Sequence, residues 1–87
     1  MNISITKNEF LALKACLNYS NKESQLDDNF SNGGIEEFMS ILNWNINQVK
    51  GLISSLEQKG LGYNEGHIFW ISELGVETVF NYMENNQ

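Results

Sequence analysis

The sequence of 87 residues predicts a mostly α-helical α+β fold with one small β-hairpin, and three observations point to this class. Apolar residues recur at steps of three and four between positions 35 and 59, which is the period of helices with one buried side. Two short runs, 62–64 and 67–71, then flank Glu65-Gly66, where a glycine suits a tight hairpin turn. A further helical repeat follows Ser72, at Val76, Val79, Phe80 and Met83.

The amino-terminal segment predicts an arm followed by a helix. Residues 1–5 alternate isoleucine with polar neighbours, so we expect an arm or a short strand. Thr6-Lys7-Asn8-Glu9 matches a capping box, in which the Thr6 hydroxyl and the Glu9 carboxylate bond the first free amides of a helix. That helix is expected over about residues 7–19, with Cys16 as a small core residue.

Residues 20–34 are mostly polar and turn-forming, so they predict a loop. It has room for one short helical turn that buries Leu26 and Phe30. A loop of this length in so small a domain is a place where function or disorder can reside.

The centre of the chain predicts a helix-turn-helix. A strongly apolar helix is expected over 35–42, and Asn43-Trp44-Asn45 follows as the turn, with Trp44 in the core. Asn45 can cap the next helix because its side-chain oxygen can accept the free amides. That helix, about 46–59, should bury one side, and two helices joined so closely form this motif. The inward residues are expected to be Ile46, Val49, Ile53 and Leu56.

The carboxyl-terminal part predicts the hairpin and a closing helix. Gly60 stands where a left-handed helix cap is expected, and strands follow on both sides of Glu65-Gly66. Ser72 caps a last helix over about 73–83, and residues 84–87 are expected to form a frayed tail.

Two runs at this spacing, Leu56-Glu57-Gln58-Lys59-Gly60-Leu61 and Ile71-Ser72-Glu73-Leu74-Gly75, resemble the MarR-like (multiple antibiotic resistance regulator) group of winged helix-turn-helix proteins. The resemblance covers about two thirds of the chain. It implies that the helix over 46–59 is a recognition helix whose first turns enter the major groove of DNA, and that the hairpin is the wing. The same fold also serves as a protein-docking module, and fold alone does not choose between the two.

The outward positions of the helix over 46–59 are the candidate DNA-binding residues. Asparagine and glutamine can bond adenine in bidentate fashion, and lysine and serine can hold phosphate or guanine. Gly51 permits close approach of the backbone at a helix-propensity cost of about 1 kcal/mol. The alternatives are contact with a protein and an ordinary solvated surface. The candidates are Asn45, Asn47, Gln48, Lys50, Ser54, Ser55 and Gln58.

The expected wing carries Asn64, Glu65 and His67 and has no arginine, so it departs from the basic wing tips that reach a minor groove. Ile68 and Trp70 are expected to lean outward, while Phe69, Ile71 and His67 share the core side of the strand. An exposed Trp70 would be a protein-binding anchor. The alternative is that Trp70 covers a neighbouring helix.

The charge is unusual for a DNA-binding domain, which normally carries a positive patch. Five lysines, no arginine and eleven carboxylates give a net charge of -6. Residues 45–71 are nevertheless balanced, because Lys50 and Lys59 offset Glu57 and Glu65. The candidate DNA-binding segment is therefore neutral, and the acidic excess lies on either side of it.

Composition excludes several other classes. Residues 1–87 suit a single domain, and 41% hydrophobic content argues against a disordered chain. No apolar run approaches the roughly 20 residues of a membrane-spanning helix, and the first residues lack a secretory signal, so a soluble, cytoplasmic protein is expected. Cys16 and His67 lie far apart and no phosphate-binding glycine loop exists, so we expect no enzymatic activity, no cofactor and no metal site.

Two hypotheses follow. The first is a small winged-helix transcriptional regulator that binds double-stranded DNA, with the first and last helices as homodimer surfaces so that two half-sites add. The second is an acidic protein-interaction module (an adaptor, an inhibitor or a nucleic-acid mimic) that does not bind DNA directly. The small, acidic, asparagine-rich composition suits an accessory protein of a phage or mobile element.

Overall fold

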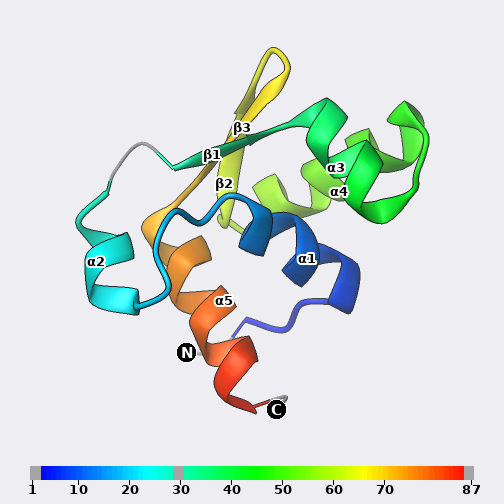
Figure 1. Ribbon diagram of the computed structural model, residues 1–87. Coiled ribbons are helices and arrows are strands. Elements are labelled where there is room, and N and C mark those ends of the chain that lie inside the picture. The colour runs from blue at the N-terminus through cyan, green and yellow to red at the C-terminus, as the bar shows by residue number, and fades with distance from the viewer. Residues whose placement is uncertain (1–2, 29–30, 86–87) are drawn as a thin grey trace.

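A computed structural model describes residues 3–28 and 31–85, and this part of the chain forms an α+β fold (Figure 1). Helices pack against a three-stranded antiparallel sheet, and the end of its β2–β3 hairpin projects away from them. No helix of these two ranges is long and apolar enough to cross a membrane. The elements in order are α1 Lys7–Ala15, α2 Lys22–Leu26, β1 Asn32–Gly34, α3 Ile35–Leu42, α4 Ile46–Gln58, β2 Gly62–Glu65, β3 Ile68–Ile71 and α5 Glu73–Asn85.

The start of α1 confirms the predicted capping box. The Glu9 amide donates to the Thr6 hydroxyl at 3.1 Å, and the Thr6 amide donates to the Glu9 carboxylate at 2.8 Å. Residues 3–5 form no strand, and Ile3 and Ile5 pack against the core, so they act as an arm. Further along α1, the Phe10 ring stacks on Tyr82 of α5 with centroids 4.3 Å apart.

The predicted extent of the first helix, to residue 19, is wrong, because α1 ends at Ala15. The amides of Asn18 and Tyr19 donate to the Gln25 side-chain oxygen, at 2.7 and 3.0 Å, instead of continuing the helix. A side chain seven residues further on therefore turns the backbone away from the helical path.

The prediction of a loop over residues 20–34 is wrong at its carboxyl end, where β1 forms, while α2 fits the short helical turn that the prediction included. α2 is the short helical turn that the sequence allowed, but its fully buried residue is Gln25, whereas Leu26 is only partly buried. Phe30, the other residue expected to be buried there, lies outside the described residues. The Gln25 amide donates to the Ser31 hydroxyl, which ties α2 to the residue before β1.

The sheet has the order β1-β3-β2. Two of the three residues of β1 are glycines, so the strand fits against the core without side chains that would need space. Gly33 pairs with Phe69, and a Cβ on Gly33 would stand 2.8 Å from the Phe38 ring. The Phe38 and Phe69 rings meet edge to face, with centroids 6.2 Å apart, in the centre of the core. Because β1 ends at Gly34 and α3 begins at Ile35, the sheet leads directly into α3.

α3 and α4 form the predicted pair of helices with a three-residue turn. Asn43 ends α3 in the left-handed conformation at φ 56°, which asparagine tolerates better than most residues. Trp44 packs against the core as expected. Ile46 does not, because 39% of it is exposed in the first turn of α4, at the outer end of the helix pair (Figure 1). Burial of α4 begins at Val49.

The hairpin is confirmed, but its turn lies one residue later than predicted. Glu65 pairs with Ile68, so Gly66 and His67 form the turn, with Gly66 at φ 67°. His67 is therefore not part of the strand and does not share the core side of Phe69. After the hairpin, the Ser72 hydroxyl accepts the amide of Gly75 at 3.0 Å and so caps α5.

α5 is longer than predicted and closes the core. It continues to Asn85, so the prediction that residues 84 and 85 belong to a frayed tail is wrong, and residues 86–87 lie outside the described part. Gly75 allows α5 to touch the chain that follows α4, because an added Cβ would clash with the Leu61 carbonyl. The core comprises Ala12, Leu13, Cys16, Ile35, Phe38, Val49, Leu52, Ile53, Leu56, Leu61, Phe69 and Val79.

Candidate nucleic-acid interface

One side of α4 is polar and exposed along most of its length. Val49, Leu52, Ile53 and Leu56 are buried on the opposite side. The exposed positions span roughly 100° of the helix circumference, because 47, 51, 54 and 58 follow at steps of four, three and four, and 50 lies beside 51. We call this set the α4 stripe: Asn47, Lys50, Gly51, Ser54 and Gln58.

Two predicted contact residues, Asn45 and Gln48, are exposed but already engaged with the start of the helix. The Gln48 amide donates to the Asn45 side chain at 2.9 Å, and the Asn45 amide donates to the Gln48 side chain at 3.0 Å. This reciprocal capping box satisfies two free backbone donors. Their carboxamides therefore organise α4 and are less available to an outside ligand.

Ser55, another predicted contact residue, lies outside the stripe and points into the protein. Its hydroxyl donates to Glu9 of α1 at 2.8 Å. The same carboxylate forms an ion pair with Lys59 at 2.9 Å, and Lys59 also donates to the Ser4 carbonyl at 3.2 Å. Because Glu9 holds Lys59, Lys50 is the lysine of the exposed α4 surface.

The Glu9 carboxylate is almost fully buried, and this cluster controls its charge. Burial by itself raises the pKa of Glu9, but hydrogen bonds from Lys59, the Thr6 amide and Ser55 outweigh burial and hold the pKa below the ordinary value of 4.5. Glu9 therefore stays ionised at neutral pH and joins α1 to α4. The cluster positions the α4 stripe and is not itself an exposed binding site.

A hydrogen bond from the β2–β3 hairpin to α4 fixes the position of the hairpin. The backbone amide of Asn64 donates to the Glu57 carboxylate at 2.8 Å. The Asn64 side chain is partly buried and donates to the Gly66 carbonyl at 3.0 Å, while its oxygen has no hydrogen-bond partner among the described residues. Of the predicted wing residues, only Glu65 and His67 are exposed, at the far end of the hairpin.

The outer face of the sheet carries an apolar patch. Residues directly opposite one another in paired strands share a face, so Trp70 lies between Asn32 and Tyr63, and Ile68 lies next to them. Tyr63 is 54% exposed and Ile68 is 41% exposed, which confirms the outward direction of Ile68. Trp70 is partly buried, so it is neither the bare anchor nor the fully covered residue that the sequence left open.

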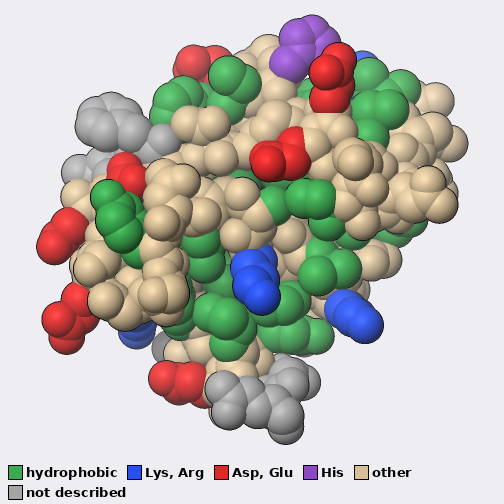
Figure 2. All heavy atoms as spheres, in the orientation of Figure 1, with side chains coloured by type: hydrophobic (Ala, Val, Ile, Leu, Met, Phe, Trp, Pro, Cys, Tyr) green, Lys and Arg blue, Asp and Glu red, His purple; other side chains and the backbone are tan. Residues whose placement is uncertain are grey.

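The α4 stripe contains no acidic side chain, although Glu57 is exposed on the same helix. Glu36 and Glu37 are exposed in the first turn of α3, and Glu57 and Glu65 lie beside the hairpin. On the face drawn in Figure 2, acidic side chains are scattered over several elements and form no single patch. The stripe thus combines one cation with uncharged amide and hydroxyl groups.

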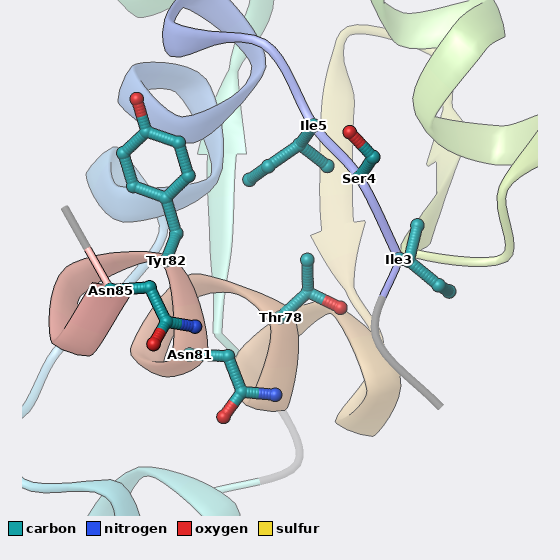
Figure 3. Close-up of a pocket in the computed structure, with 7 residues that line it drawn as sticks. All are labelled: Ile3, Ser4, Ile5, Thr78, Asn81, Tyr82 and Asn85. Carbon is teal, nitrogen blue, oxygen red and sulfur yellow. The ribbon is translucent and has the colours of Figure 1, made fainter.

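Two of the hollows that lie away from α4 separate α5 from the amino-terminal part of the chain. One, of about 260 Å³, lies between the amino-terminal arm and α5, and none of the described residues that line it is acidic or basic (Figure 3). The second, of about 340 Å³, lies between the end of α1 and α5, where a dimer surface was predicted. Its lining is Lys14, Leu17, Asn18, Tyr19, Ser20, Phe80 and Met83.

The described residues offer little for covalent or metal chemistry. Burial, followed by the nearby charge of Glu37, raises the pKa of the Cys16 thiol to about 12, so this buried core residue is not a thiolate nucleophile at neutral pH. Residues 3–28 and 31–85 contain no group of three or more His, Cys, Asp or Glu side chains that could hold a metal ion.

Sequence reasoning missed two residues that shape these surfaces, Glu57 and Tyr63. A signal for Tyr63 existed, because a two-residue turn at Gly66-His67 places it opposite Trp70. No local pattern indicates the bond from Asn64 to Glu57, which depends on how the hairpin returns to α4. No protein-family model, no curated protein and no solved structure gives a significant match to this chain.

Proposed function

We propose that this protein is a winged helix-turn-helix DNA-binding protein that regulates transcription, with α4 in the major groove and the β2–β3 hairpin as the wing. The arrangement of α3, a three-residue turn, α4 and an immediately following hairpin supports this assignment. The observation that carries it is the α4 stripe. Its donors and acceptors are exposed along a helix of 13 residues, and none of its residues is acidic.

The dimensions of α4 suit this role. An α-helix with its side chains is about 10–12 Å wide, which matches the major-groove width of about 12 Å. Thirteen residues give a length of about 20 Å. Asn47 lies in the first turn, where a recognition helix meets base edges, and Ser54 and Gln58 follow along the same side. Glu57 holds the hairpin beside the helix, so both elements would approach DNA as one unit.

The charge predicts weak binding by a single copy. Counterion release makes affinity depend on the number of phosphates that cations neutralise, and the α4 stripe supplies only Lys50. A homodimer through α1 and α5 would add two half-sites. The hollow between these elements, with partly buried Phe80 and Met83, is the surface that we assign to it.

Binding to random duplex DNA at low and moderate salt tests the proposal. Lys50→Glu should weaken binding to all sequences and make the dependence of log affinity on log salt less steep by about one unit per copy. Lys22→Glu is the matched control, because Lys22 is an exposed lysine on α2, at the opposite side of the molecule from α4 (Figure 1). If the wild-type protein leaves duplex DNA unshifted even at low salt, direct DNA binding is the wrong assignment.

The outer face of the sheet supports a second candidate function, docking to another protein. Tyr63 and Ile68 are exposed there beside the partly buried Trp70, and aromatic side chains are frequent anchors of protein interfaces. Ile68→Glu should abolish capture of a protein partner, and Lys50→Glu should leave it intact. The opposite pattern, with capture lost only in Lys50→Glu, would remove the sheet face from consideration.

A further inference from the structure

Gly51 lies in the interior of α4 without an internal reason for being glycine. Its φ is not positive, so its backbone conformation is open to any residue. A Cβ added there would meet no atom within 4 Å, so packing does not require glycine either. Alanine would favour the helix more. The missing side chain at this position leaves the backbone of α4 open to close approach from outside the chain.

Asn47 lies one helical turn before Gly51 on the same side of α4. Its side chain is exposed and has no hydrogen-bond partner among the described residues, in contrast to Asn45 and Gln48 in the capping box. An asparagine carboxamide can donate to N7 and accept from N6 of the same adenine. Because the asparagine side chain is short, such a bidentate contact needs a helix that lies deep in the groove.

We infer that the α4 stripe recognises A·T base pairs through their major-groove edges, with Asn47 bonding adenine and Gly51 marking the closest approach of the helix to the bases. This inference rests on the proposed DNA binding. Arginine, the commonest bidentate partner of guanine, is absent from the chain. Lys50 lies at the margin of the stripe, on the side of Glu57, where it suits a phosphate better than a base.

Replacement of adenine by 7-deazaadenine tests the contact itself. Sites selected from a random duplex pool should be rich in A·T pairs. The analogue keeps base pairing but removes the N7 acceptor, so wild-type affinity should fall about tenfold. Asn47→Ala should lose the same factor on adenine and become insensitive to the analogue. Asn8→Ala, which truncates an exposed asparagine of α1, is the matched control and should bind as the wild type does.

Gly51→Ala tests the closest approach. It should raise the melting temperature by about 4–8 °C, because helix propensity improves and nothing is crowded. Affinity for the selected site should nevertheless fall about tenfold, because the added methyl group holds the helix away from the bases. A stabilised variant with unchanged affinity would overturn the role of Gly51.

The outcomes separate this inference from the proposed function. Wild-type binding that does not distinguish adenine from 7-deazaadenine overturns adenine recognition by Asn47, while DNA binding itself stands. Wild-type protein that binds no duplex at low salt overturns both. Affinity should fall for Asn47→Ala on adenine and for the wild type on the analogue. If Asn47→Ala on the analogue binds no more weakly than either change alone, the two changes remove the same contact, which supports direct bonding.

Discussion

Glu9 is the residue of α1 that joins this helix to α4 through hydrogen bonds. It is 2% exposed, and its carboxylate accepts hydrogen bonds from Thr6, Ser55 and Lys59. Because its folded pKa lies below the ordinary value, ionised Glu9 stabilises the folded state above pH 4.5. That contribution declines as the pH falls from about 4.5 through the folded pKa, where the folded carboxylate takes up its proton.

Glu9→Gln should lower the free energy of unfolding at neutral pH by roughly 1.5–3 kcal/mol, because charged hydrogen bonds become neutral ones. The difference from the wild type should shrink below about pH 4.5. Urea unfolding of both proteins across this range measures it, with Glu84→Gln as a control at an exposed position. A difference that stays constant into acid would mean that Glu9 contributes packing and not charge.

At the scale of elements, α2 and the chain on either side of it are held by a buried polar network. Gln25 accepts from the amides of Asn18 and Tyr19 and donates to Ser31. Ser31 in turn donates to Asp28 at 3.2 Å, and its carbonyl accepts from Ile71 of β3. One side chain thus ends α1, anchors α2 and leads the chain into the sheet.

Gln25→Ala should destabilise the protein by roughly 2–3 kcal/mol, because two backbone amides lose their acceptor. Hydrogen exchange should accelerate at Asn18 and Tyr19 more than in α4. Gln58→Ala removes the same group from the exposed α4 stripe and should change stability by about 0.5 kcal/mol or less. Equal effects of the two substitutions would show that the network does not determine this segment.

The elements that sequence could predict are those specified by neighbouring residues. The Thr6 capping box, the apolar period of α3 and α4, and Gly66 in the hairpin all act within a few positions. β1 could not be predicted, because Asn-Gly-Gly has little strand propensity and pairs with residues 68–70 far along the chain. The prediction that Ser55 is a contact residue is wrong for the same reason, since its partner Glu9 is 46 residues away.

At the scale of the whole molecule, charge sets how copies of this chain would meet. A net charge of -6 makes like copies repel, and salt screens that repulsion. DNA binding has the opposite dependence, because salt weakens phosphate contacts. The hollow between α1 and α5 offers apolar contact through Leu17, Phe80 and Met83, which salt does not weaken.

We therefore expect self-association to strengthen between low and moderate salt while the affinity for DNA falls. Met83→Glu should give a monomer at every salt concentration, because it adds a negative charge to the surface that two copies would bury. It should also weaken DNA binding, because the second half-site is lost. Ile41→Glu, at an apolar residue of α3 that is 45% exposed, is the control and should leave the mass unchanged. Sedimentation equilibrium measures the mass of each variant. A monomeric wild type at moderate salt would exclude the α1–α5 dimer, and any DNA binding would then come from α4 of a single copy.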